Sequence, residues 1–202
     1  MKALLALLLV PFAAFADPVL IAAARDQVGV TTIYDPAYVA LDFPGGDLDR
    51  SRGVCTDVVI RAMRDAWGVD LQLALNRDMK AHFAAYPANW GLATTDRNID
   101  HRRVPNLQVF LDRMGASLPV TSDPTDFSAG DFSAGDVVTW MLPGNLPHIG
   151  ILSDQVGASG APMVLHNIGR GAQEEDRLFD FPITGHYRIT PQARARMVEL
   201  GR

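Results

Sequence analysis

Residues 135–152, GDVVTWMLPGNLPHIGIL, contain two strand patterns separated by a turn. Residues 137–142 are rich in β-branched and aromatic side chains, which favour strands. Residues 148–152 alternate in polarity, which is typical of a strand with one buried face. Pro143, Gly144 and Asn145 stand between the two patterns and favour a turn. The stretch therefore predicts an antiparallel hairpin.

The rest of the second half continues in the same way, whereas the first half has a helical period. Further strands are expected at 163–166 and 183–189. Helices are expected at 17–29, 56–67, 71–86, 107–114 and 191–200. Helices first and strands second predict an α+β fold, in which N-terminal helices pack on an antiparallel sheet from the C-terminal half.

The composition narrows the function classes. The chain has 202 residues, of which 48% are hydrophobic and 20% charged, and its formal net charge is -5. This composition is that of a folded chain rather than a disordered one. The acidic balance argues against a broad nucleic-acid-binding surface, so we expect no nucleic-acid partner.

The first 16 residues have the pattern of a signal peptide. Lys2 precedes an apolar run from 3 to 10, and Ala14 and Ala16 form the small-x-small arrangement that signal peptidase accepts. The apolar run is too short for a membrane span, which needs about 20 residues. We therefore expect cleavage after Ala16, a periplasmic or secreted protein without a membrane anchor, and one catalytic domain over residues 17–202.

Cys55 is the only cysteine, so an internal disulfide is excluded. On a helical wheel it shares a face with Val58, Val59 and Ala62, in the first turn of the helix expected there. The N–H groups of a helix start lower the pKa of a thiol and can bind an oxyanion during acyl transfer. Cys55 is thus a candidate nucleophile, with an inert core cysteine as the alternative.

A thiol nucleophile needs a base and a group that orients the base. His148 and Gly150 are expected on one face of their strand, where Gly150 leaves room for the helix that carries Cys55. His166 ends the next strand, so antiparallel pairing would bring it beside His148. Asn167 is the alternative orienting residue. The pattern predicts a Cys–His–His line as the catalytic group.

A polar loop supplies candidate substrate-binding residues, namely Asp100, His101, Arg102 and Arg103. Two arginines could bind a carboxylate such as those of cell-wall peptides, and Asn167 could also contact substrate. The alternative is an internal salt-bridge cluster that holds a long loop in place. The residues alone leave both open.

The order of these motifs resembles the NlpC-type branch of papain-like cysteine hydrolases, which cleave peptide or amide bonds in bacterial cell walls. Five strings are also similar to an uncharacterised family of exported bacterial proteins grouped with that branch: GVCTDVVIR (53–61), NIDHRRVPNL (98–107), LPHIGI (146–151), HNIG (166–169) and GHYR (185–188). The resemblance implies a papain-like fold, with Cys55 as nucleophile, His148 as base and His166 as orienting residue. This sequence departs from the common NlpC-type pattern at Thr56 and Asp57, directly after the cysteine, and over the long segment 68–130.

The expected function is therefore a periplasmic cysteine amidase or endopeptidase that needs no cofactor or metal and acts on cell-wall peptides or other amides. One alternative is a zinc-dependent hydrolase whose ligands are Cys55, His148 and His166, although no HExxH or CxxC spacing is present. Another is a catalytically inactive module that binds cell-wall peptide. The sequence leaves the scissile bond and the oligomeric state open.

Overall fold

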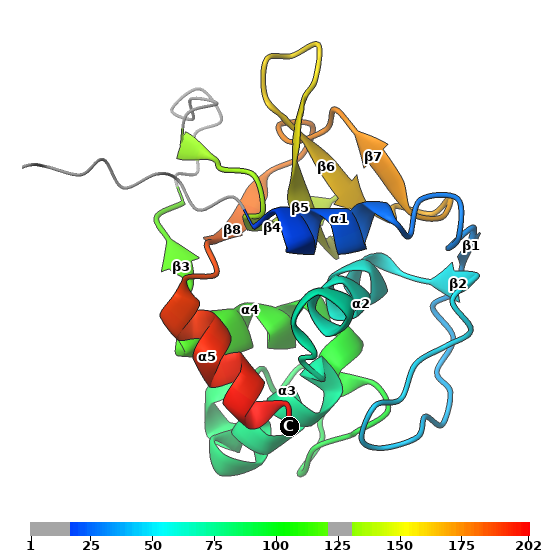
Figure 1. The fold of residues 1–202 in the computed structure, drawn as a ribbon. Helices are drawn as coiled ribbons and strands as arrows, with labels where there is room; N and C mark the ends of the chain where they lie inside the picture. The colour runs from blue at the N-terminus through cyan, green and yellow to red at the C-terminus, as the bar shows by residue number, and fades with distance from the viewer. Residues whose placement is uncertain (1–16, 121–130) are drawn as a thin grey trace, which may run out of the picture.

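The computed structural model describes residues 17–120 and 131–202, and it is built of a sheet and a set of helices (Figure 1). In Figure 1 the main sheet forms the upper part of the molecule, α2 to α5 lie below it, and α1 runs between the sheet and α2. The helices are α1 (Pro18–Arg25), α2 (Cys55–Trp67), α3 (Leu71–Ala81), α4 (Val104–Met114) and α5 (Pro191–Leu200), with short 3-10 helices η1 (Phe83–Ala85) and η2 (Asp100–Arg102).

The main sheet has six strands in the order β3-β8-β4-β5-β6-β7, and every neighbouring pair is antiparallel. A second, parallel pair joins β1 to β2 just before α2. The strands are β1 (Ile33–Tyr34), β2 (Arg52–Gly53), β3 (Ser117–Leu118), β4 (Val137–Leu142), β5 (Leu146–Val156), β6 (Pro162–His166), β7 (Gln173–Glu175) and β8 (Ile183–Tyr187).

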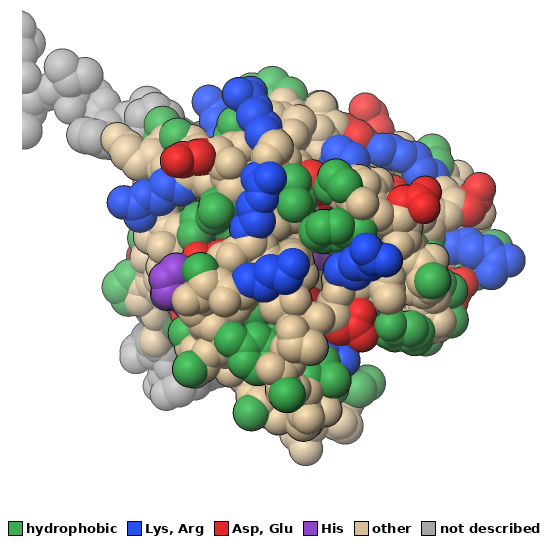
Figure 2. All heavy atoms as spheres, turned by 90° about the horizontal axis from the view of Figure 1, so that it is seen from below, with side chains coloured by type: hydrophobic (Ala, Val, Ile, Leu, Met, Phe, Trp, Pro, Cys, Tyr) green, Lys and Arg blue, Asp and Glu red, His purple; other side chains and the backbone are tan. Residues whose placement is uncertain are grey.

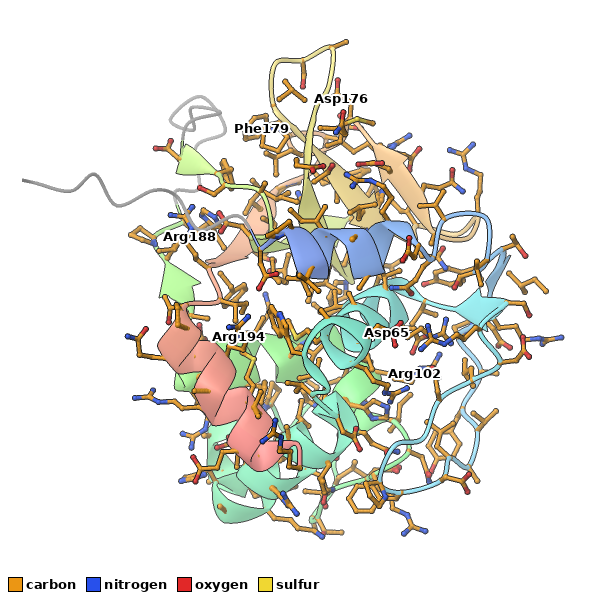
Figure 3. All side chains as sticks on the ribbon, in the orientation of Figure 1. Asp65, Arg102, Asp176, Phe179, Arg188 and Arg194 are labelled. Atoms are coloured by element: carbon orange, nitrogen blue, oxygen red, sulfur yellow. The ribbon has the colours of Figure 1, made fainter. Side chains whose placement is uncertain are left out.

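The two faces of the sheet bury different side chains, as the two-residue period of strands requires. Ile149, Ile151 and Leu165 belong to the core shared with α1 and α2. Trp140 and Val164 belong to a second, smaller core on the other face. The segment after β7 covers this other face, and the labelled Asp176 and Phe179 lie there, away from α2 to α5 (Figure 3).

Helix α2 is the central helix, because all nine residues of Cys55–Met63 are buried. Its start is capped from within: the Asp57 carboxylate accepts the Val54 N–H at 2.7 Å, which satisfies one of the free donors near a helix start. Its end is set by Gly68, whose φ of 67° is a left-handed conformation that glycine adopts without strain. Cys55 is therefore the first residue of a buried, well-bounded helix.

The structure confirms the α+β class and the antiparallel sheet. Four short strands, β1, β2, β3 and β7, were not predicted, because two or three residues are too few to show a period. Helix α1 ends at Arg25, four residues early, and α3 ends at Ala81. The expected signal peptide, residues 1–16, lies outside the described residues.

The surface carries charges of both signs. Figure 2 views the helical side from below, where Lys and Arg side chains form a broken band with acidic and apolar side chains beside it.

In the described ranges, no helix has both the length and the apolar character needed to cross a membrane.

Gly150 faces a different neighbour from the one expected. A Cβ at this position would lie 2.8 Å from Val164 Cγ1 and 3.1 Å from His166 Cβ. The expectation that Gly150 makes room for the helix carrying Cys55 is therefore wrong. Ile149 and Ile151 face the helices, so the even-numbered residues of β5 face the opposite side. The missing side chain makes room for His166.

We expect Gly150→Ala to destabilise the fold by about 1–3 kcal/mol, since the added methyl group overpacks β6. Urea unfolding followed by circular dichroism measures the change. Val156→Ala is the control on the same strand: Val156 is 67% exposed, and its change should stay within about 0.5 kcal/mol. Equal stability of Gly150→Ala and the wild type would contradict this packing.

Candidate functional site

Cys55 lies where α2 begins and β6 ends. The Asn167 side chain donates from Nδ2 to the Gly53 carbonyl oxygen at 3.0 Å, which ties the end of β6 to the segment before Cys55. The Ile149 backbone N–H donates a hydrogen bond to the Cys55 sulfur. Ile149 directly follows His148, but adjacent strand residues point to opposite faces, so the His148 side chain lies on the other face of the sheet from the thiol. The direct Cys–His–His line expected from the sequence is therefore not formed in this structure.

The resting thiol is neutral. Burial raises the pKa of Cys55 to about 12, although hydrogen bonds from the backbone N–H groups of Ile149, Thr56 and Cys55 itself act in the opposite direction. The lowered pKa predicted from the helix start is therefore wrong: the N–H groups are present, but loss of solvent outweighs them.

His148 and His166 are hydrogen bonded in the structure. His148 Nε2 and His166 Nδ1 are 2.8 Å apart, and His166 Nε2 lies 2.9 Å from Glu175 Oε2. Burial is the main cause that lowers the pKa of His148 to about 3 and also lowers the pKa of His166. The three side chains form a line on the face of the sheet that bears the smaller core.

The direction of these hydrogen bonds follows from the carboxylate. Arg170 and Arg177 flank Glu175 at 3.3 and 3.4 Å, and an ionised carboxylate only accepts hydrogen bonds. His166 must then donate from Nε2, so its Nδ1 accepts from His148 Nε2. The remaining nitrogen of His148, Nδ1, carries a lone pair. In the described part of the chain no hydrogen bond joins it to Cys55.

Of the two candidates for the orienting residue, His166 contacts His148 and Asn167 does not. Asn167 Nδ2 donates to Gly53, and its Oδ1 accepts the Gly169 N–H at 3.1 Å. Both ends of the amide are therefore engaged away from His148. Adjacent strand residues point to opposite faces, and this separates the two candidates.

A cavity of about 340 Å³ opens beside Cys55. Its walls are mostly apolar, and two arginines supply its charged groups. The lining residues are Tyr34, Pro36, Val54, Cys55, Asn89, Trp90, Ile99, Arg102, Arg103, Val104, Pro105 and Pro147. Its position and shape suit a ligand that reaches the thiol.

Arg102 belongs to an internal salt bridge that holds its loop in place, which is the alternative to substrate binding considered from the sequence. Its guanidinium donates from Nε and Nη2 to the Asp57 carboxylate, both at 3.0 Å, and to the carbonyl oxygens of Asp35 and Ala37. Both side chains of the ion pair are buried. The labelled Arg102 thus lies between α2 and the loop after β1 (Figure 3).

The other residues of that loop separate into two groups. Arg103 lines the cavity, bonds Asp100 at 3.0 Å and stacks over the Trp90 ring at 4.0 Å. Asp100 and His101 are buried and do not line the cavity. Burial is the largest cause that raises the pKa of Asp100, and burial also lowers the pKa of His101 to about 3. Only Arg103 of this set is placed to meet a ligand.

Two site residues were missed in the sequence. Glu175 lies on β7, a strand of three residues, and β7 pairs with β6 so that Glu175 shares a face with His166. The two acidic residues at 174 and 175 were visible in the sequence, but the pairing of their short strand with β6 was not. Trp90 lies in an irregular segment whose packing no local pattern shows.

The histidine geometry gives no support to a zinc site. His148 and His166 direct nitrogens at each other, so those lone pairs do not converge on an ion. Across residues 17–120 and 131–202, no three His, Cys, Asp or Glu side chains are grouped as metal ligands.

We expect iodoacetamide to label Cys55 in the native protein at least about a hundredfold more slowly at pH 7.5 than in urea, because the native thiol has the higher pKa. The native rate should keep rising through pH 9, whereas the unfolded thiol levels off near its pKa of about 8.5. Mass spectrometry follows the single labelled site. A native rate equal to the unfolded one would contradict a buried, neutral thiol.

Comparison with known proteins places the chain in a family. Residues 21–189 match the model described as "Domain of unknown function (DUF1287)". The chain is also 52% identical over 165 residues to the "Uncharacterized protein YijF" of Escherichia coli (strain K12). The aligned region covers 82% of this chain and 78% of that protein. The chain belongs to the DUF1287 family.

Proposed function

We propose that this protein is a cysteine hydrolase that cleaves amide bonds in peptides. The observation that carries the proposal is the hydrogen-bonded line from Glu175 through His166 to His148, which leaves a lone pair on His148. This line lies across strand β5 from the Cys55 thiol, which accepts the backbone N–H of Ile149 on the helical face. A thiol, a base and an oriented second base are the elements of nucleophilic acyl transfer.

The chemistry follows from the neutral resting state. Because the His148 ring lies on the other face of the sheet from Cys55, the proposed transfer needs a relay: as the Cys55 sulfur forms a bond to the amide carbon, its proton passes to Nδ1 of His148 through a water molecule near the start of β5. The carbonyl oxygen becomes an oxyanion, and backbone N–H groups at the start of α2 are suited to bind it. His148 then returns the proton to the leaving amine as the carbon–nitrogen bond breaks. Water, deprotonated by His148, cleaves the thioester and restores the thiol.

Glu175 has a defined role in this scheme. When His148 takes up the proton it becomes a cation in a buried site, which burial alone disfavours. The hydrogen bond to His166 and the carboxylate beyond it oppose that cost. Glu175 therefore acts as a positioning residue that makes the imidazolium accessible during the reaction.

The substrate class and the location rest on sequence resemblance. We propose an NlpC-type, papain-like arrangement, because a cysteine at a helix start packs against antiparallel strands that carry the histidines. Such hydrolases act on cell-wall peptides, so we propose these as substrates. Export with cleavage before Asp17 fits this class. The Asp17 side chain caps α1 and accepts the Trp67 indole N–H at 3.1 Å, so the fold uses this residue.

The test is digestion of purified peptidoglycan sacculi, with products identified by mass spectrometry. We expect wild-type protein to release specific fragments and Cys55→Ala to release none. His148→Ala should lower the rate at least about 1,000-fold, and Glu175→Gln about 10–100-fold, because an orienting group contributes less than the base. Each variant is first checked for folding by circular dichroism.

Glu174→Gln is the matched control. Glu174 is next to Glu175 on β7 but bonds Arg25 through its carboxylate at 2.8 Å, away from the histidines, so it should retain near-wild-type activity. Identical products from wild type and Cys55→Ala would contradict the proposal. Binding to sacculi by both proteins with no products from either would indicate the inactive binding module instead.

A further inference from the structure

We propose that Arg103, stacked on Trp90, recognises a carboxylate on the ligand, so that the cavity beside Cys55 selects peptides with an acidic group. The binding part of this inference stands by itself, whereas its effect on turnover rests on the proposed function. Neither Arg103 nor Trp90 is part of the proposed proton-transfer line.

The charges of the cavity favour an anion. The protein as a whole is acidic, with a net charge of -5. Yet Arg102 and Arg103 are the charged residues that line the cavity in the described part of the chain, and no Asp or Glu side chain lines it. An apolar wall around a guanidinium strengthens its attraction for a carboxylate, because less water competes.

Arg102 has little capacity left for a ligand. Its Nε and Nη2 bond Asp57, Nη2 also bonds Asp35, and Nη1 bonds Ala37. Its side chain is 2% exposed. A ligand would have to displace buried hydrogen bonds that hold the cavity wall together, so Arg102 shapes the site rather than binding in it.

Arg103 has the capacity that Arg102 lacks. A guanidinium carries five N–H donors, and within the described residues one atom of Arg103, Nη1, donates to a side chain, that of Asp100. Its side chain is 17% exposed. The Trp90 ring at 4.0 Å holds the guanidinium plane in place. A fixed, incompletely used guanidinium suits two-point binding of a carboxylate.

The neighbouring walls define the rest of the ligand. Tyr34 and Trp90 present aromatic surface to the cavity, and Pro105 and Pro147 present rigid apolar surface. These surfaces suit a short carbon chain between the carboxylate and the amide. Asn89 adds a neutral amide to the same lining. The class of ligand is therefore a small peptide with a carboxylate-bearing side chain or end.

Binding is tested on Cys55→Ala with two peptides that differ in charge: acetyl-alanyl-glutamate and acetyl-alanyl-glutamine amide. We expect the acidic peptide to bind at least about tenfold more tightly, measured by NMR titration of the Trp90 indole N–H. Adding Arg103→Gln should reduce the preference below about twofold, and Arg103→Lys should keep part of it while retaining an Asp100 partner. Arg97→Gln is the control, because exposed Arg97 contacts Phe43 outside the cavity and should leave the preference unchanged.

The contrary outcomes are distinct. Equal binding of the two peptides, or an unchanged preference in both Arg103 variants, would overturn the inference. Inorganic phosphate that displaces the acidic peptide with the same affinity would also overturn it, since the site would then take any small anion.

The effect on turnover is measured with two fluorogenic substrates, glutaryl 7-amino-4-methylcoumarin and its carboxamide analogue. If the wild type hydrolyses both substrates equally, the selectivity assigned to Arg103 is overturned and the proposed hydrolase activity stands. If it hydrolyses neither, but still prefers the acidic peptide in binding, the proposed hydrolase activity is overturned and the binding inference stands.

Discussion

The buried ion pair between Asp57 and Arg102 supports the geometry of the whole site. The Asp57 carboxylate also accepts the Val54 N–H and so caps α2 immediately before Cys55. Arg102 reaches across to the loop after β1, whose residues line the cavity. Breaking a buried ion pair by removing one partner typically costs about 3–5 kcal/mol, because the other charge is left uncompensated. One pair therefore connects the position of the thiol with the shape of the cavity.

From this anchor the site extends across the sheet. The thiol contacts the strand backbone at Ile149, while the His148 side chain lies on the far face with His166 and Glu175. Burial keeps both imidazoles and the thiol uncharged at rest. The protein thus stores no thiolate–imidazolium pair. In the proposed reaction, charge develops only when the substrate carbonyl accepts the sulfur, which protects a lone cysteine from other electrophiles.

The features of the fold and the site that could be predicted from the sequence are those set by residues close together in the chain. Periodic stretches of six residues or more, such as 137–142, reveal their strands because the pattern is local. The position of Cys55 at a helix start and the pairing of His148 with His166 follow from such local patterns too. The hydrogen bond between the two histidines is consistent with that pairing.

The remaining features depend on long-range packing. Glu175 belongs to a strand of three residues, too short to recognise, and the role of Arg102 depends on Asp57, 45 positions away. The side of β5 that faces α2 was predicted wrongly, because both sides of the strand carry apolar residues and its alternation does not show which side the helices cover. The neutral state of Cys55 depends on burial, which a helical wheel does not measure.

The proton arrangement of the two histidines is the central claim, and nitrogen NMR of ¹⁵N-histidine-labelled protein at pH 7 tests it most directly. His148→Gln and His166→Gln variants assign the two rings. The account predicts that both rings are neutral and carry the proton on Nε2, because Glu175 accepts from His166 and His166 accepts from His148. A proton on Nδ1 of His148, or an imidazolium at either position at pH 7, would contradict it.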